Sequence, residues 1–177
     1  LCGREEEIVV MFVDLRGFTA ISEKLLPYDT VYLLNQYLKI AGEAIVQSGG
    51  RIDKFISDGI MALFTDGSGV EENSKNALLA AGKLAEGIKE LSTETSSDFG
   101  SDLKFGIGIH AGTSVVGVMG YGENITDTAI GDCVNVASRL EQLTKEEECQ
   151  LIITSDLYQR SGLPVQASFE KNVTVKG

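Results

Sequence analysis

The run from Ile8 to Asp14 constrains the fold more than any other stretch, because an apolar segment ends there in a carboxylate. The residues before Asp14 are apolar and mostly β-branched, which is typical of a largely buried strand. An ionised carboxylate costs several kcal/mol to bury unless a cation pairs with it. Gly17 and a helix predicted from about Thr19 follow. We therefore expect Asp14 to have a cationic partner at the end of this strand.

The remaining segments lack the regular strand–helix alternation of a doubly wound sheet. A helix is predicted from its N-cap Asp29 to Gly49-Gly50, and the turn Ser57-Asp58-Gly59 joins two apolar segments in a hairpin. We expect an α+β fold with helices packed on one face of a largely antiparallel sheet. The other predicted segments are a helix at 72–91, a solvated loop at 92–102, strands at 103–112, 114–121, 150–155 and 166–176, a connection at 122–127, and a helix from about 132.

Length and composition exclude several classes of protein. A chain of 177 residues suits a single domain, 1–177, and the missing initiator Met suggests one excised from a longer protein. The net charge of −11, without a Lys/Arg cluster, argues against nucleic-acid binding. No apolar run approaches the roughly 18 residues that cross a bilayer, so we expect a soluble domain without membrane contact. The odd set Cys2, Cys133 and Cys149 suits free thiols in a reducing, cytoplasmic compartment.

Two aspartates occupy analogous places, Asp14 at a strand end and Asp58 at a hairpin tip. If the strand pairs with the hairpin, the carboxylates meet at one sheet edge, where each raises the pKa of the other unless a cation lies between them. Oxygen ligands of this kind suit Mg²⁺ or Mn²⁺. The helix start at Gly17 to Thr19 adds backbone N–H groups that can bind phosphate. Alternatively, Asp58 simply stabilises its own turn, and Gly17 an ordinary strand-to-helix connection.

A third feature is the pair Asn135 and Arg139, four residues apart on a predicted helix. At that spacing the two side chains project from one face, a neutral donor beside a fixed cation. Such a pair could hold a phosphoryl group that gains charge in a transition state. The alternative is an exposed helix face on which Arg139 pairs with Glu141 or Glu86.

Three longer stretches resemble the signature regions of class III nucleotidyl cyclase catalytic domains, the adenylyl and guanylyl cyclases. They are VVMFVDLRGFTAISEKL, GGRIDKFISDGIMALF and TAIGDCVNVASRLEQLT, and GIGIHAGTSVVG and LIITSDLY match the segments around the third. The resemblance covers nearly the whole chain. It implies a ferredoxin-like, palm-like core and a homodimer arranged head to tail, with active sites at the interface. It also implies conversion of ATP to 3′,5′-cyclic AMP and pyrophosphate.

The resemblance also implies roles for individual residues. Two Mg²⁺ or Mn²⁺ ions would bind at Asp14, Leu15 and Asp58, and the substrate phosphates at Gly17, Phe18, Thr19 and Lys176. Lys54 and Thr128 match the two purine readers, with Thr as in one bacterial-type subclass of adenylyl cyclases. Asn135 matches the residue that orients the ribose, and Arg139 the one that stabilises the transition state. In family geometry, one chain supplies the aspartates and the phosphate turn, and the other supplies Lys54, Thr128, Asn135 and Arg139.

Substrate choice follows from hydrogen-bond polarity. Lys54 donates to the adenine N1 acceptor, and the Thr128 hydroxyl accepts from the N6 amino group, whereas guanine presents a carbonyl and an N1–H. ATP is therefore expected over GTP. The alternatives are a guanylyl cyclase and a catalytically silent nucleotide-binding domain. Relatives with Thr at this place include bicarbonate-responsive cyclases, which suggests the same stimulation here.

Two further residues carry expectations. Ser57 stands where the family usually has Gly, and this strains the turn before Asp58 if the backbone there needs a positive φ. His110 is the single histidine, and we expect a structural role for it because two-metal chemistry can activate a hydroxyl without a side-chain base.

Overall fold

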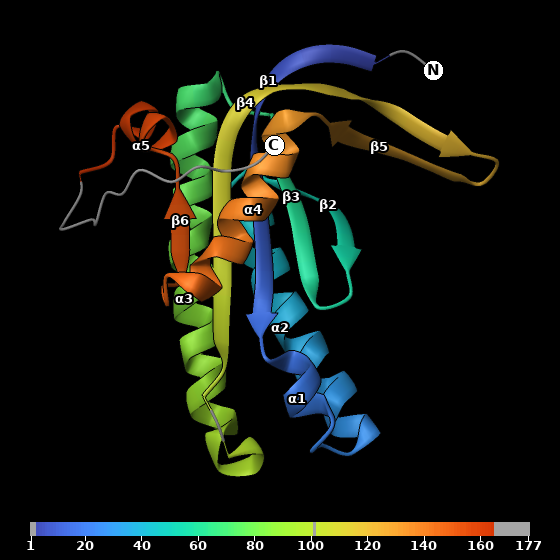
Figure 1. Cartoon of the computed structure of the whole chain (residues 1–177), viewed down its shortest axis with the longest axis vertical. Helices are drawn as coiled ribbons and strands as arrows, with labels where there is room; N and C mark the ends of the chain where they lie inside the picture. The colour runs from blue at the N-terminus through green and yellow to red at the C-terminus, as the bar shows by residue number, and fades with distance from the viewer. Residues whose placement is uncertain (1–2, 101, 165–177) are drawn as a thin grey trace.

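The computed structural model describes residues 3–100 and 102–164. Its centre is one six-stranded sheet with the order β2-β3-β1-β4-β5, and β6 pairs with β4 (Figure 1). Every pairing is antiparallel except β4–β6, which is parallel. The strands are β1 (Gly3–Arg16), β2 (Arg51–Ile56), β3 (Gly59–Phe64), β4 (Lys104–Tyr121), β5 (Asn124–Ile130) and β6 (Leu151–Ile153). The predicted α+β fold with a largely antiparallel sheet is confirmed.

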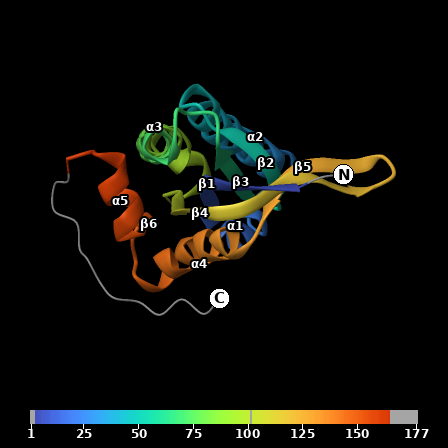
Figure 2. The ribbon, with the colours of Figure 1, turned by 90° about the horizontal axis from the view of Figure 1, so that it is seen from above.

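Helices cover both faces of the sheet (Figure 2). On one face α2 and α3 pack against Val9 and Met11 of β1, and on the other α4 packs against Ile8 and Val10. The prediction of helices on one face was therefore wrong, because β1 buries both of its alternating rows of side chains. The helices are α1 (Phe18–Ser22), α2 (Pro27–Gln47), α3 (Val70–Phe99), α4 (Asp132–Glu146) and α5 (Ser155–Ser161).

Two helix boundaries differ from the prediction. Helix α2 begins at Pro27 with Leu26 as its N-cap, so Asp29 lies in the first turn; proline at the first helical position has its φ already fixed for the helix. Helix α3 continues to Phe99, through most of the predicted loop at 92–102. Its polar end is packed, because Thr95 Oγ1 donates to the Leu91 carbonyl at 2.7 Å and Ser92 Oγ accepts from the Leu103 N–H at 2.9 Å.

The two predicted strands 103–112 and 114–121 form one continuous strand, β4, which their glycines do not interrupt. This strand pairs with β1 from Arg16↔Lys104 to Gly3↔Gly117. Helix α4 lies so close to β4 that a Cβ on Gly108 would be 2.3 Å from the Glu141 backbone nitrogen. These glycines therefore allow the helix to approach the sheet. The predicted connection at 122–127 also falls largely within strand β5.

Several other predictions can be placed on the structure. The hairpin around Ser57–Gly59 is confirmed as β2–β3, and the strand expected at 150–155 is β6. Cys133 is buried and Cys149 exposed, both as free thiols. Among the described residues, no helix is long and apolar enough to cross a bilayer. The strand predicted at 166–176, Lys176 and Cys2 all lie outside the described residues.

Candidate functional site

The sheet brings the two predicted metal-binding aspartates together. The register Val13↔Ile60 between β1 and β3 sets the end of β1 beside the β2–β3 turn that carries Asp58. The Asp58 carboxyl group lies close enough to Asp14 to raise the pKa of the Asp14 carboxyl group. Asp14 Oδ1 is buried and has no hydrogen-bond partner. A carboxylate pair with a free buried oxygen therefore lies at this edge of the sheet.

A positive charge would stabilise the ionised carboxyl groups at this edge of the sheet. Burial, and then the neighbouring Asp58 carboxyl group, raise the pKa of Asp14 to about 8. Burial and then the same two aspartates raise the pKa of the Tyr37 phenol, whose hydroxyl also has no partner. A divalent cation would favour the ionised carboxylates and supply a partner for Asp14 Oδ1. The residues present thus fit a Mg²⁺ or Mn²⁺ ion.

Arg16, two residues after Asp14, interacts with a third carboxylate, that of Glu141. Arg16 Nη2 lies 3.7 Å from Glu141 Oε1 and donates to the Glu141 carbonyl at 3.2 Å. Burial raises the pKa of Glu141, while Arg16 acts in the opposite direction. Among residues 3–100 and 102–164, no three His, Cys, Asp or Glu side chains gather as a metal site. Further ligands of an ion at Asp14 and Asp58 would thus come from backbone, water or substrate.

Leu15 can contribute only its backbone to such a site. Its side chain is 5% exposed and belongs to the core under α2 and α3. Its backbone N–H acts to lower the pKa of the Asp14 carboxyl group, against the larger effect of burial.

The residue before Asp58, Ser57, has the positive φ that was expected to strain this turn. Ser57 has φ 58° and, with Asp58, forms the two-residue loop between the paired residues Ile56 and Gly59. Hairpin loops of this kind favour glycine at the first position, because a Cβ disfavours the left-handed backbone. A strained serine therefore precedes one of the two aspartates.

The predicted phosphate turn connects β1 to the five-residue helix α1. Gly17 has φ 65°, a left-handed conformation that suits glycine. Gly17 and Thr19 are exposed, while Phe18 packs against the core. The first-turn N–H groups of a helix have no acceptor within it, so this exposed turn can offer donors to an anion.

The two predicted purine readers meet at a buried carboxylate, Asp53. Thr128 Oγ1 donates to Asp53 Oδ2 at 2.7 Å, and Lys54 Nζ lies 3.4 Å from the same oxygen. The Asp53 side chain is completely buried, Thr128 is 5% exposed, and the Lys54 side chain is 45% exposed. Asp53 was not among the site residues predicted from the sequence. The available signal was an aspartate directly before Lys54 in a short strand segment, between the apolar residues Ile52 and Phe55.

Asn135 and Arg139 lie on α4, one turn apart. Asn135 is exposed and Arg139 half-buried. Within the described part of the chain, Arg139 forms no ion pair with Glu141 or Glu86. Among the same described residues, no hydrogen bond or ion pair joins the side chains of Asn135 and Arg139 to the aspartates of their own chain. His110, on β4, has its Nδ1 3.2 Å from Thr154 Oγ1, and burial lowers its pKa.

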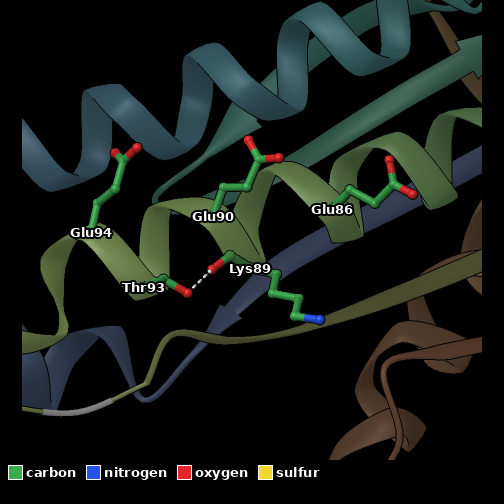
Figure 3. Close-up of a pocket in the computed structure, with 5 residues that line it drawn as sticks. All are labelled: Glu86, Lys89, Glu90, Thr93 and Glu94. Atoms are coloured by element: carbon green, nitrogen blue, oxygen red, sulfur yellow. Dashed lines mark hydrogen bonds between the residues drawn. The ribbon is translucent and has the colours of Figure 1, made fainter.

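A hollow on α3 is lined by none of these residues (Figure 3). Glu86, Glu90 and Glu94 point from successive turns of the helix, and Thr93 Oγ1 donates to the Lys89 carbonyl at 3.0 Å. All five lining residues come from one helix. The hollow is an acidic helix surface rather than a convergent site.

Comparison with known proteins identifies the family. The model of the adenylate and guanylate cyclase catalytic domain matches residues 2–177. The chain belongs to this family. An adenylate cyclase of Anabaena cylindrica is 41% identical to this cyclase domain in an alignment of 177 positions that covers 96% of the chain and 34% of the relative. A Dictyostelium discoideum adenylate cyclase, terminal-differentiation specific, is 38% identical over 97% of the chain and 8% of the relative. The cyclase domain thus spans about a third or less of these relatives.

Solved structures of both substrate types resemble the domain. The guanylyl cyclase Cya2 superposes with a TM-score of 0.87 at 29% identity, over 100% of this chain and 89% of that chain. The adenylyl cyclase CyaB from P. aeruginosa gives a TM-score of 0.82 at 30% identity, over 90% and 82% of the two chains. The fold of the domain is therefore that of nucleotide cyclase catalytic domains.

Proposed function

We propose that this domain converts ATP to 3′,5′-cyclic AMP and pyrophosphate, in a head-to-tail homodimer. The observation that carries the proposal is the Asp14–Asp58 pair with its free buried oxygen. The 41% identical adenylate cyclase supports the choice of reaction. The Lys54–Thr128 pair on one carboxylate supports the choice of adenine.

Asp14, Asp58 and the backbone of Leu15 would hold two Mg²⁺ or Mn²⁺ ions, which supply activation of the ribose 3′-hydroxyl and neutralise the phosphates. The exposed N–H groups at Gly17 to Thr19 would bind the β- and γ-phosphates. The carboxylates must be ionised to act as ligands, so ion binding displaces the proton that burial favours on Asp14.

The residues that read the base and the transition state would come from the partner copy. Lys54 donates to adenine N1 and Thr128 accepts from N6. Asn135 orients the ribose, and the Arg139 guanidinium stabilises charge that develops on the α-phosphoryl group. The sharing of one site by two chains is proposed from the resemblance to the family. Lys176 is proposed as a further phosphate ligand from the resemblance alone.

The test is turnover of ATP by the purified domain with Mg²⁺ or Mn²⁺, measured as cyclic AMP. The change Asp14→Ala is expected to lower the rate by at least a hundredfold, because it removes a ligand of the ions. Asp66→Ala is the matched control, since Asp66 is an exposed loop carboxylate. Wild-type turnover by Asp14→Ala would refute the assignment of the site.

The second candidate is a guanylyl cyclase, which the superposition on Cya2 favours. Initial rates with ATP and GTP, measured side by side, decide between the two. A preference for GTP would show that the reading of Lys54 and Thr128 is wrong.

A further inference from the structure

We propose that Asp53 is a positioning residue that sets the choice of purine, because it fixes the Thr128 hydroxyl as a hydrogen-bond acceptor. The inference rests on the proposed function and deepens it. Its basis is the contact in which Thr128 Oγ1 donates to Asp53 Oδ2 at 2.7 Å.

A break in strand pairing puts Asp53 in this place. Ile52 pairs with Ala62 and Lys54 with Met61, so Asp53 is an extra residue in β2. Such bulges redirect a side chain and are common next to active sites. Strands β2 and β5 are the two ends of the main strand order, yet the bulge carries Asp53 into contact with Thr128 of β5. The position of Asp53 is therefore built into the sheet.

The groups around Asp53 are hydrogen-bond donors. Lys54 Nζ lies 3.4 Å from Oδ2, and Arg51 Nη1 lies 3.8 Å from Oδ1. The carboxylate that these two cations face accepts hydrogen bonds and cannot donate them. The hydroxyl hydrogen of Thr128 is therefore directed to Asp53.

The consequence for the base follows from the single hydrogen of a hydroxyl. With that hydrogen on Asp53, Thr128 Oγ1 presents only lone pairs to a purine. The adenine N6 amino group donates to such an oxygen, whereas the carbonyl at C6 of hypoxanthine or guanine faces it lone pair to lone pair. Thr128 without Asp53 could rotate and serve either base. Selectivity at C6 thus depends on a residue that need not touch the base.

The experiment compares kcat/KM for ATP and for inosine triphosphate, which lacks the 2-amino group of GTP. Lys54 is present in every variant, so its preference for the adenine N1 acceptor over the hypoxanthine N1–H is the same in all of them. A change in the ratio of the two kcat/KM values between variants therefore reports mainly on recognition of the group at C6. Asp53→Asn leaves one acceptor oxygen, for which Lys54 and Thr128 compete, and brings an N–H donor toward the hydroxyl. The ATP preference is expected to fall by about tenfold, the range for a mismatched buried hydrogen bond. Asp53→Ala should change it in the same direction.

Asp127→Asn is the matched control. Asp127 also contacts Arg51, at 3.6 Å, but its side chain is 56% exposed, and among the described residues it has no hydrogen bond or ion pair with Lys54 or Thr128. The ratio should stay at the wild-type value in this variant. A purely structural role for Asp53 would lower both rates together, so an unchanged ratio in a folded Asp53→Asn protein overturns the proposal.

Two measurements keep the result unambiguous. If neither Asp53 variant folds by circular dichroism, the unmodified protein is assayed with purine riboside triphosphate, which has no group at C6. A fixed acceptor requires a severalfold preference for ATP over this analogue, and equal rates overturn the proposal. Absence of ATP turnover by the wild-type domain refutes the proposed function itself, whereas ATP turnover with an unchanged ratio refutes only the role of Asp53.

Discussion

Replacing Ser57 by glycine should stabilise the domain. Ser57 holds φ at 58° in the turn before Asp58, and a left-handed backbone costs a residue with a Cβ roughly 1–2 kcal/mol. Glycine removes that cost but loses about 0.4–1 kcal/mol through the greater freedom of the unfolded chain. Taken at the middle of both ranges, the net gain in the free energy of unfolding is about 0.8 kcal/mol. With an m-value of about 2 kcal/mol/M, the urea midpoint should rise by roughly 0.3–0.5 M.

Two variants separate backbone strain from other effects of the change. Ser57→Ala removes the hydroxyl but keeps the Cβ, so it should not raise the midpoint. Glu148→Gly relieves the other positive-φ position that lacks glycine among the described residues, at φ 51° just after α4. It should stabilise the domain by a similar amount without affecting the site.

The assay is equilibrium unfolding in urea with a chelator present, followed by circular dichroism. A midpoint for Ser57→Gly at or below that of Ser57→Ala would refute the strain argument. Because the substitution leaves Asp58 and the hairpin pairing in place, cyclic AMP formation should persist in the glycine variant.

Three further predictions concern the rest of the site and its frame. The folded-state pKa of Asp14, about 8, exceeds its ordinary value of 3.8, so the metal-free protein should lose stability as pH rises between these values. Urea midpoints measured across this pH range for the wild-type and Asp14→Asn proteins test this. An identical dependence of the midpoint on pH in both proteins would contradict it. Gly108→Ala should cost several kcal/mol, because its Cβ would lie 2.3 Å from the Glu141 nitrogen, whereas Gly82→Ala, with open space around it, should be neutral or stabilising in a thermal melt. Inactive Lys54→Ala and Asp14→Ala proteins should regain partial activity when mixed, and two chains that stay inactive together would argue against a shared site.

Local pattern predicted the parts of the site that depend on one segment. The apolar run that ends in Asp14 predicted a buried strand, and the turn Ser57–Gly59 predicted the hairpin that carries Asp58. Their meeting could be anticipated as well, since a strand paired with a hairpin aligns their ends. The spacing of Asn135 and Arg139 placed both on one helix, α4.

Other features depend on packing between distant segments. The continuity of β4 and the covering of both sheet faces follow from the close approach of α4 to Gly108, which no local pattern shows. The polar end of α3 is helical because Ser92 and Thr95 bond to neighbouring backbone groups.

By itself, the sequence determined the two carboxylates and, through its motifs, the family, because these depend on residue type and spacing; the roles of Lys54 and Thr128 as purine readers stay a prediction from the resemblance. The tertiary structure alone decided which groups touch. It gave Asp14 a pKa of about 8 by burying it beside Asp58, and it brought Asp53 of a bulged strand to Thr128, 75 residues away. Burial, charge and hydrogen-bond direction depend on neighbours in space, and those neighbours exist only once the sheet has formed.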